Sequence, residues 1–277
     1  MVDYHVHPDF SHDAQGSVVE FCRRAIELGL EEVCFTTHYE PDPARKDVEF
    51  VRVDGKVVPV ASDWAHHYLA AVEQARREFP ELSVLAGVEV GYEPGLEGMI
   101  HDFLRSHPFD FVLGAVHCLG SICLTAHGEV DGFRSRYVKL GAETVADRYL
   151  LGLRAAAGST LFDCLAHLDI YRKYIEPLFD ERFGRAIEAG LGAVLQVIAA
   201  SGTGIEVNTS ALRRGNPEPY PALRILQMAR DARVRTFTVG SDAHRPADLG
   251  TGLESAVRAL LDLGIEPARF RKRKRVQ

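Results

Sequence analysis

The stretch Val2-Asp3-Tyr4-His5-Val6-His7 begins the chain with a short β-type run that finishes in two histidines. His5 and His7 are two residues apart, so on an extended strand both side chains lie on one face and can bind the same ion. Similar β-type runs recur to the end of the chain, and each is followed by a longer helical pattern. This alternation predicts a parallel sheet or barrel.

The pattern contains seven strand–helix units. The strands are expected at 2–5, 33–36, 83–90, 109–116, 161–166, 205–207 and 236–239. The helices are expected at 17–29, 63–79, 96–106, 136–156, 181–200, 221–232 and 253–263. A capping box formed by Ser17 and Glu20 marks the first helix, and Asp54-Gly55 predicts a small hairpin in the long loop after the second strand.

No linker interrupts this rhythm, and 277 residues suit one α/β barrel of roughly 250 residues. We therefore expect a single barrel domain over residues 1–268. The segment 269–277 carries six basic residues between Arg269 and Arg275. Such a short charged run is typical of a solvated terminus, so we interpret it as a basic C-terminal tail.

Composition and charge limit the classes of function. The chain has 46% hydrophobic residues and a formal net charge of −7, which indicates a globular protein and disfavours long nucleic acid as a partner. No apolar run reaches the roughly 18 residues of a membrane span, and the first residues lack the pattern of a signal peptide. Five cysteines, an odd number, favour reduced thiols. We expect a cytoplasmic protein without a membrane partner, and the oligomeric state stays open.

Candidate metal ligands cluster where the predicted strands end. In a parallel barrel the C-terminal ends of all strands share one face, where such folds build active sites. The polar residues at these ends are His5 and His7, His38, Glu89, His117, His167 and Asp169, Asn208, and Asp242 and His244. Imidazole and carboxylate donors without a thiolate suit Zn²⁺, Mn²⁺ or Fe, and the candidates exceed the three or four ligands that one ion takes. The sequence therefore predicts more than one ion.

Five other histidines are interpreted as structural or surface residues. They lie on predicted helices, at helix ends or in an irregular loop: His66, His67, His101, His107 and His127.

Eight short motifs follow one another in a fixed order. They are Asp3-Tyr4-His5-Val6-His7, Phe10-Ser11-His12-Asp13, Thr37-His38, Gly87-Val88-Glu89-Val90, Gly114-Ala115-Val116-His117, Ala166-His167-Leu168-Asp169, Glu206-Val207-Asn208-Thr209-Ser210 and Gly240-Ser241-Asp242-Ala243-His244. With these motifs the chain resembles the polymerase and histidinol phosphatase (PHP) family of metal-dependent phosphoesterases, specifically its histidinol-phosphatase-like branch. The resemblance covers nearly the whole chain and implies a distorted (β/α)₇ TIM-like barrel.

The same resemblance implies a cleft with two or three divalent metal ions. The implied ligands are His5, His7, Glu89 and Asp242 for the first ion; Glu89, His117 and His167 for the second; and Asp13, His38 and His244 for the third. Glu89, Asp242 and His244 are also the implied catalytic residues. Asp13 departs from the pattern, because many histidinol phosphatases carry histidine at this spacing.

The implied chemistry is hydrolysis of a small phosphorylated substrate. Bound metal lowers the pKa of water to about 7, so a metal-bridged hydroxide is expected to attack phosphorus in line. Phosphate positioning calls for cationic or polar side chains beyond strands five, six and seven, and the candidates are Arg172, Asn208, Arg213, Arg214 and Arg245.

Three functions are consistent with these residues. The resemblance favours a phosphatase acting on L-histidinol phosphate in histidine biosynthesis. A phosphoesterase acting on nucleotides or oligonucleotides is an alternative, for which the basic segment 269–277 is the only indication in the sequence. A noncatalytic metal-binding domain is a third possibility, which the complete set of ligand positions disfavours.

Overall fold

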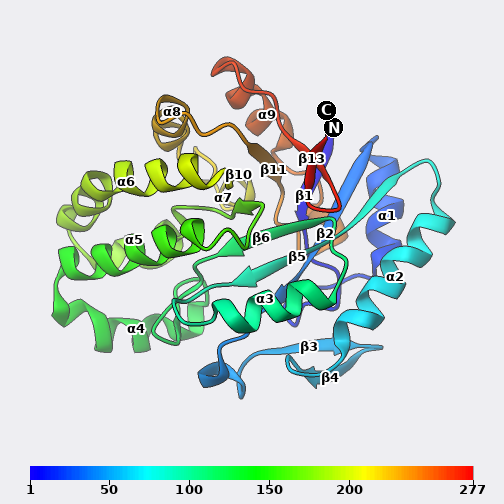
Figure 1. The fold of residues 1–277 in the computed structure, drawn as a ribbon, viewed down its shortest axis with the longest axis horizontal. Coiled ribbons are helices and arrows are strands. Elements are labelled where there is room, and N and C mark those ends of the chain that lie inside the picture. The colour runs from blue at the N-terminus through cyan, green and yellow to red at the C-terminus, as the bar shows by residue number, and fades with distance from the viewer. Residues whose placement is uncertain (277) are drawn as a thin grey trace.

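The computed structural model describes residues 1–276 and contains seven parallel strands that curl into a nearly closed barrel, with helices around the outside (Figure 1). The strands follow one another in chain order around the sheet. They are β1 (Val2–Val6), β2 (Glu32–Tyr39), β5 (Ser83–Gly91), β6 (Phe111–Ala115), β9 (Cys164–Leu165), β10 (Gly204–Asn208) and β11 (Phe237–Gly240). The predicted α/β barrel of seven strands is confirmed.

The first and last strands meet at the C-terminal end of the barrel. The segment after β11 runs beside β1, where the His7 amide donates to the Ala243 carbonyl at 2.8 Å and the Asp242 amide donates to the His5 carbonyl at 2.8 Å. Val6 and Ala243 form an isolated parallel bridge. The residues that close the barrel are therefore direct neighbours of the predicted metal ligands.

Helices cover the outer surface of the sheet and shield its apolar side chains from water. They are α1 (Val18–Glu27), α2 (Trp64–Glu78), α3 (Glu97–Ser106), α4 (Val130–Tyr137), α5 (Ala142–Gly158), α6 (Glu181–Ser201), α7 (Ser210–Arg213), α8 (Leu223–Asp231) and α9 (Leu253–Asp262). The predicted capping box of α1 is present, with the Ser17 hydroxyl accepting from the Glu20 amide. Burial of this apolar surface is the main stabilising contribution to the fold.

Two predicted elements differ from the structure. The helix expected at 136–156 is divided, because Gly141 has φ = +89° and interrupts the helical backbone between α4 and α5. The strand expected at 161–166 is reduced to Cys164–Leu165. Two residues after Leu165, His167 has φ = +27°, outside the β region.

Two hairpins lie beside the C-terminal end of the barrel. β3 (Phe50–Val53) and β4 (Lys56–Pro59) form the hairpin predicted at Asp54-Gly55. β7 (Cys118–Leu119) and β8 (Ile122–Cys123) form a shorter one between the expected strand at 109–116 and the expected helix at 136–156.

One helix, α6, is long and apolar enough to cross a membrane by length and composition alone. Its apolar face is buried and packs on α5 and α8, with Phe183, Leu191 and Ile198 in the core. The absence of a membrane partner stays a prediction.

The basic segment at the C-terminus is folded. β12 (Arg269–Arg271) and β13 (Lys274–Val276) form a hairpin at the N-terminal end of the barrel, where the Phe270 amide donates to the Tyr4 hydroxyl at 2.7 Å. Phe270 is buried against the rings of Tyr4 and Phe111. The segment is therefore a folded hairpin and not a free tail, because the apolar Phe270 anchors it, while Lys272, Lys274 and Arg275 are exposed as expected. The division into domains at residue 268 stays a prediction.

Candidate metal centre

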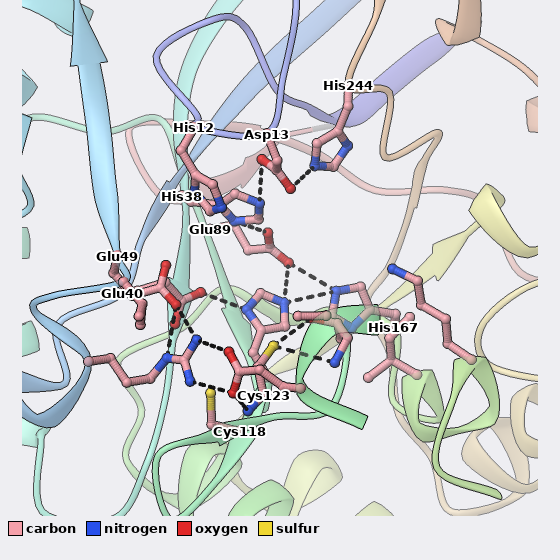
Figure 2. Close-up of a pocket in the computed structure, with 18 of the residues that line it drawn as sticks. His12, Asp13, His38, Glu40, Glu49, Glu89, Cys118, Cys123, His167 and His244 are labelled. Atoms are coloured by element: carbon pink, nitrogen blue, oxygen red, sulfur yellow. Dashed lines mark hydrogen bonds and ion pairs between the residues drawn. The ribbon is translucent and has the colours of Figure 1, made fainter. Parts of the chain in front are cut away.

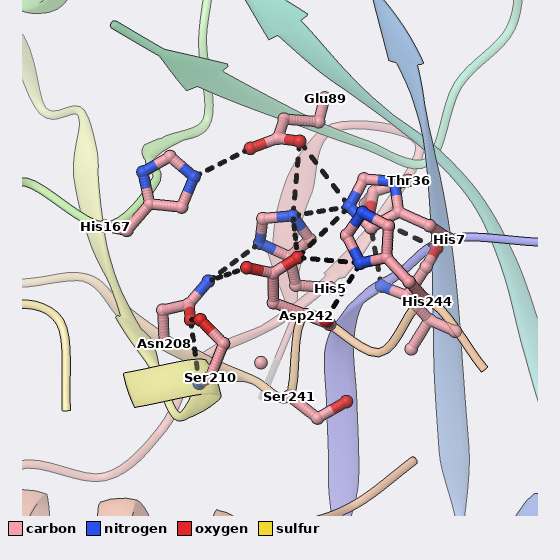
Figure 3. Close-up of polar contacts among 12 residues, drawn as sticks. His5, His7, Thr36, Glu89, His167, Asn208, Ser210, Ser241, Asp242 and His244 are labelled. Atoms are coloured by element: carbon pink, nitrogen blue, oxygen red, sulfur yellow. Dashed lines mark hydrogen bonds and ion pairs between the residues drawn. The ribbon is translucent and has the colours of Figure 1, made fainter. Parts of the chain in front are cut away.

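Histidine and carboxylate side chains converge at the C-terminal end of the barrel (Figure 3). The Nε2 atoms of His5 and His7 are 2.9 Å apart, and both imidazoles are fully buried. Glu89 Oε2 lies 3.4 Å from His5 Nε2 and 3.5 Å from His7 Nε2, while Asp242 Oδ1 lies 3.7 Å and 3.5 Å from the same two atoms. Four donor atoms, from β1 and the residue that follows it, from β5 and from the segment after β11, thus converge.

Glu89 is the centre of the cluster because its two oxygens face different groups of histidines. Its Oε2 faces His5 and His7, whereas its Oε1 lies 3.0 Å from His167 Nε2 and 3.3 Å from His117 Nε2. The carboxylate is 1% exposed. It therefore has the position of a bridging group between two sets of imidazoles.

A third group lies nearer to solvent, between the loop after β1 and the loop after β11 (Figure 2). Asp13 Oδ2 is 3.3 Å from His244 Nε2, and Asp13 Oδ1 is 3.7 Å from His38 Nε2. The sheet register pairs His38 with Glu89, and His38 Nδ1 lies 2.9 Å from Glu89 Oε2. The predicted ligands of all three ions are thus brought together, including Asp13.

Two carboxylates that the sequence analysis did not assign hold the outer nitrogens of these imidazoles. His5 Nδ1 is 2.5 Å from Glu206 Oε1, and His117 Nδ1 is 2.7 Å from Glu40 Oε1. Such contacts fix the tautomer that leaves Nε2 free as a ligand. The signal was present in the period of two residues along an extended chain, since Glu206 precedes Asn208 by two and Glu40 follows His38 by two.

Two glycines make room for these orienting carboxylates. A Cβ atom on Gly240 would lie 2.4 Å from His5 Cβ and 2.6 Å from Glu206 Oε1. A Cβ atom on Gly91 would lie 1.8 Å from Glu40 Oε2. Any side chain at either position would displace the carboxylate that holds the histidine.

Asn208 completes the support on the side of β10. Its amide nitrogen donates to Glu206 Oε2 at 3.2 Å and to Asp242 Oδ2 at 3.3 Å, and its Oδ1 accepts from the Ser210 hydroxyl at 2.7 Å. Asn208 therefore positions two carboxylates, and these contacts already use its polar atoms.

Asp242 itself has φ = +54°, an uncommon backbone conformation for a residue other than glycine, of the kind found at functional sites.

The cluster has a strong internal charge balance. Burial alone would raise the pKa of Glu89, but His5 and His117 hold it well below its ordinary value. Burial alone would lower the pKa of His38, whereas Asp13 and Glu89 raise it to about 9. Within residues 1–276, neither Glu89 nor Asp242 forms an ion pair with a lysine or arginine side chain. These two carboxylates thus depend on imidazoles for positive charge.

These donors fit divalent metal ions. Nitrogen and oxygen atoms converge without a thiolate, a donor set that suits Zn²⁺, Mn²⁺ or Fe. His38 Nδ1 is buried and makes no aligned hydrogen bond with any described residue, although Glu89 Oε2 is 2.9 Å away. A buried polar atom without a hydrogen bond is costly, and a metal ion between such atoms would satisfy them. The groups of three that can hold an ion include His5, His7 and Glu89, and Glu89, His117 and His167.

A pocket opens over this cluster, and the predicted phosphate-binding arginines do not line it. Arg172 pairs with Asp169 at 2.9 Å, Arg213 donates to the Asp242 carbonyl at 2.8 Å, and Arg245 pairs with Asp248. Arg214 is exposed. All four arginines lie beyond the expected strands, but three of them already bind carboxylate or carbonyl oxygens of the chain. The sequence pattern did not indicate these contacts.

The cations that do line the pocket are Arg45 and Lys173. Arg45 is held by Glu49 at 2.6 Å and by Glu129 at 2.7 Å, so its charge is neutralised. Lys173 is half-buried, and within residues 1–276 its ammonium forms no ion pair with a carboxylate; it lies 5.1 Å from the Tyr174 ring centroid. Burial lowers the pKa of Lys173. An anion entering the pocket would therefore meet this lysine as an available positive charge.

Comparison with known proteins agrees with this geometry. Residues 3–210 match the PHP domain family. A probable histidinol-phosphatase of Deinococcus radiodurans is 30% identical over 99% of this chain and 98% of its own length. A histidinol-phosphatase of Lactococcus lactis is 27% identical over 88% of this chain and 84% of its own length.

Solved structures share the fold. The crystal structure of histidinol phosphate phosphatase from Lactococcus lactis, complexed with zinc, L-histidinol and phosphate, has a TM-score of 0.78 at 24% identity and covers 100% of this chain and 98% of that chain. A putative histidinol phosphatase from Listeria monocytogenes has a TM-score of 0.76 at 20% identity, over 92% and 99% of the two chains.

Proposed function

The chain belongs to the PHP domain family, and from this membership we propose that it is a metal-dependent phosphatase that hydrolyses L-histidinol phosphate. The observation that carries the proposal is the position of Glu89 beneath the pocket. Its two oxygens face two separate groups of buried histidine nitrogens, at 3.0–3.5 Å. Bridged divalent ions are the arrangement by which many phosphatases hold both the attacking and the leaving oxygen.

The proposed ligands follow the three groups of donors. They are His5, His7, Glu89 and Asp242; Glu89, His117 and His167; and Asp13, His38 and His244. This assignment is supported by the converging donor atoms and by the two outer carboxylates that orient His5 and His117. We propose two or three divalent ions of the Zn²⁺, Mn²⁺ or Fe type.

Divalent ions at such a site supply a water of lowered pKa as nucleophile and stabilise negative charge on phosphoryl oxygens. The residues of the chain prepare the site for this chemistry. Glu206 and Glu40 keep the Nδ1 protons of His5 and His117 directed away from the site, and Asn208 fixes the rotamer of Asp242. The site is thus organised before substrate arrives, so little reorganisation accompanies the reaction.

Lys173 is proposed to bind the phosphate of the substrate. Its ammonium lies in the pocket wall without a carboxylate partner among residues 1–276, whereas Arg45 is already neutralised. A lysine provides a point charge with three donors, which suits a phosphate dianion. Lys173 therefore takes the role that the sequence analysis assigned to arginines.

The choice of substrate is supported by relatives. The relatives from Deinococcus radiodurans and Lactococcus lactis match this chain over nearly its whole length and carry the name histidinol-phosphatase. The Lactococcus lactis structure holds L-histidinol and phosphate in a protein of the same fold. A nucleotide substrate has less support, because the basic C-terminal segment lies at the opposite end of the barrel, where Arg269, Arg271 and Arg273 are ion-paired.

The test is phosphate release from L-histidinol phosphate, a nucleoside monophosphate and a short oligonucleotide, with Zn²⁺ or Mn²⁺ added to metal-free protein. We expect the highest kcat/KM for L-histidinol phosphate. Faster hydrolysis of the nucleotide would replace the proposed substrate, and metal binding without hydrolysis of any of the three would favour a noncatalytic domain.

A further inference from the structure

The β7–β8 hairpin beside the metal centre carries one cysteine on each strand. Cys118 and Cys123 are direct partners in the antiparallel register. The two-residue turn between the strands is Gly120-Ser121, with φ = +52° and +65°. Turns with two positive φ angles match the twist of a hairpin, so the facing of the two cysteines is set by the backbone.

The two cysteines form a pair without hydrogen bonds between their backbones. The next pair along the hairpin is hydrogen-bonded, since the Leu124 amide donates to the His117 carbonyl at 2.7 Å, and the two kinds of pair alternate. In a pair without backbone hydrogen bonds, such as Cys118 and Cys123, the Cα atoms are about 4.5 Å apart and the side chains lie on one face. Disulfides span Cα separations of about 4.4–6.8 Å. Cys118 and Cys123 can therefore be joined without moving the backbone.

These two thiols are also the least buried of the five. Cys118 is 7% and Cys123 8% exposed, and both line the pocket over the metal centre (Figure 2). Cys22, Cys34 and Cys164 are 0% exposed in the core. A small reagent entering the pocket reaches the hairpin pair first.

Cys123 is the better placed of the two to react first. The Thr125 amide donates to its Sγ at 3.4 Å, and the Thr125 hydroxyl oxygen is 3.1 Å from the same sulfur. Both contacts can stabilise a thiolate, which is the attacking form in disulfide exchange.

We propose that Cys118 and Cys123 form a reversible disulfide site on the wall of the pocket, with a low-molecular-weight disulfide such as oxidised glutathione as the oxidant. The Cys123 thiolate attacks one sulfur of glutathione disulfide and releases one glutathione thiolate. The Cys118 thiolate then attacks Cys123 Sγ and releases the second glutathione. Each cysteine gives up one proton, each released glutathione takes one, and the protein is oxidised by two electrons while the reagent is reduced.

The test is thiol mapping of the native, full-length protein after incubation with oxidised glutathione, followed by alkylation and digestion with trypsin. Both cysteines fall in one peptide, from Ser106 to Arg134. We expect this peptide to become lighter by two hydrogen atoms and to escape alkylation, and dithiothreitol to reverse both changes. The peptides with the three core cysteines should stay fully reduced.

Single variants identify the partner. Cys118→Ser should stop at a mixed disulfide between Cys123 and glutathione, whereas the matched core variant Cys22→Ser should still form the internal bond. A wild-type peptide that keeps both free thiols, or that carries a separate glutathione on each cysteine, would overturn the proposal. The measurement uses no phosphatase activity, so its outcome is independent of the proposed function.

Discussion

Two groups of carboxylates, one at each end of the barrel, are held in opposite ways. At the N-terminal end three carboxylates each pair with an arginine: Glu32 with Arg271, Asp110 with Arg76, and Asp163 with Arg273. At the C-terminal end Glu89 and Asp242 meet imidazoles, and no lysine or arginine of residues 1–276 forms an ion pair with either. Arginines of the chain neutralise the three carboxylates at the N-terminal end, whereas Glu89 and Asp242 are arranged to receive positive charge from a bound cation.

This difference separates stability from function. A buried carboxylate is tolerated only with a compensating charge and hydrogen bonds. Guanidinium groups provide both at the N-terminal end, so substitutions there should affect unfolding. Histidines provide ligand atoms at the other end, so substitutions there should affect metal binding and catalysis. The following predictions test this separation, beginning with the largest effect.

Replacement of both His5 and His7 by alanine should remove bound metal and reduce kcat/KM by on the order of 10³-fold or more, beyond the roughly 10–100-fold typical of residues that only orient a ligand. The reason is that two of the donors around Glu89 Oε2 are lost. Metal content and phosphate release are the measurements. The exposed pair on α2, changed to His66→Ala and His67→Ala, is the matched control and should keep both.

Glu206→Gln should lower metal affinity or kcat by about 10–100-fold, because the carboxylate that holds His5 Nδ1 at 2.5 Å is lost. Titration of metal-free protein with Zn²⁺ measures the affinity. Glu254→Gln, an exposed carboxylate on α9, is the control. Equal affinities for the Glu206 variant and wild type would show that Glu206 has only a packing role.

Lys173→Met should raise KM about tenfold with a smaller change in kcat, since a hydrogen-bonded charge on the phosphate is lost. The pH dependence provides a second readout. Burial lowers the pKa of Lys173, so the positive charge is present at low pH and lost as the pH rises through that lowered value. The KM of the wild-type enzyme should therefore rise at alkaline pH. Lys173→Arg keeps its positive charge at this pH, so its KM should not rise. A Lys173→Met enzyme with wild-type KM at every pH would exclude the role.

Arg271→Met should lower the free energy of unfolding by about 1–2 kcal/mol and leave kcat unchanged, because Glu32 stays buried without its arginine. Thermal unfolding measures this effect. Arg275→Met removes a bond to the Arg235 carbonyl only and should have a smaller effect. A loss of activity in folded Arg271→Met protein would contradict the separation of the two ends.

The sequence predicted the C-terminal end of the barrel better than the N-terminal end. Strand ends carry a period-two pattern and family motifs, so the residues that converge around Glu89 could be identified before the fold was known. Glu206 and Glu40 were missed although each lies two residues from a strand-end residue, because the period of two does not by itself distinguish a ligand from a residue that orients one. Lys173 was missed because only the three-dimensional structure shows that its ammonium has no carboxylate partner among residues 1–276.

The C-terminal hairpin was misinterpreted for a related reason. A run of basic residues is typical of a solvated end, and nothing in the sequence indicates that Glu31, Glu32 and Asp163 lie across from it. These pairs join positions more than 100 residues apart or at opposite ends of the chain. Such long-range pairing depends on the closed barrel.

Elemental analysis of the purified protein tests the central claim most directly, because the C-terminal end is proposed to obtain its positive charge from metal. The account predicts two or three divalent ions per chain in wild-type protein, and loss of these ions in the His5→Ala/His7→Ala variant but not in Arg271→Met. Wild-type protein that hydrolyses L-histidinol phosphate without any bound or added divalent metal would contradict it.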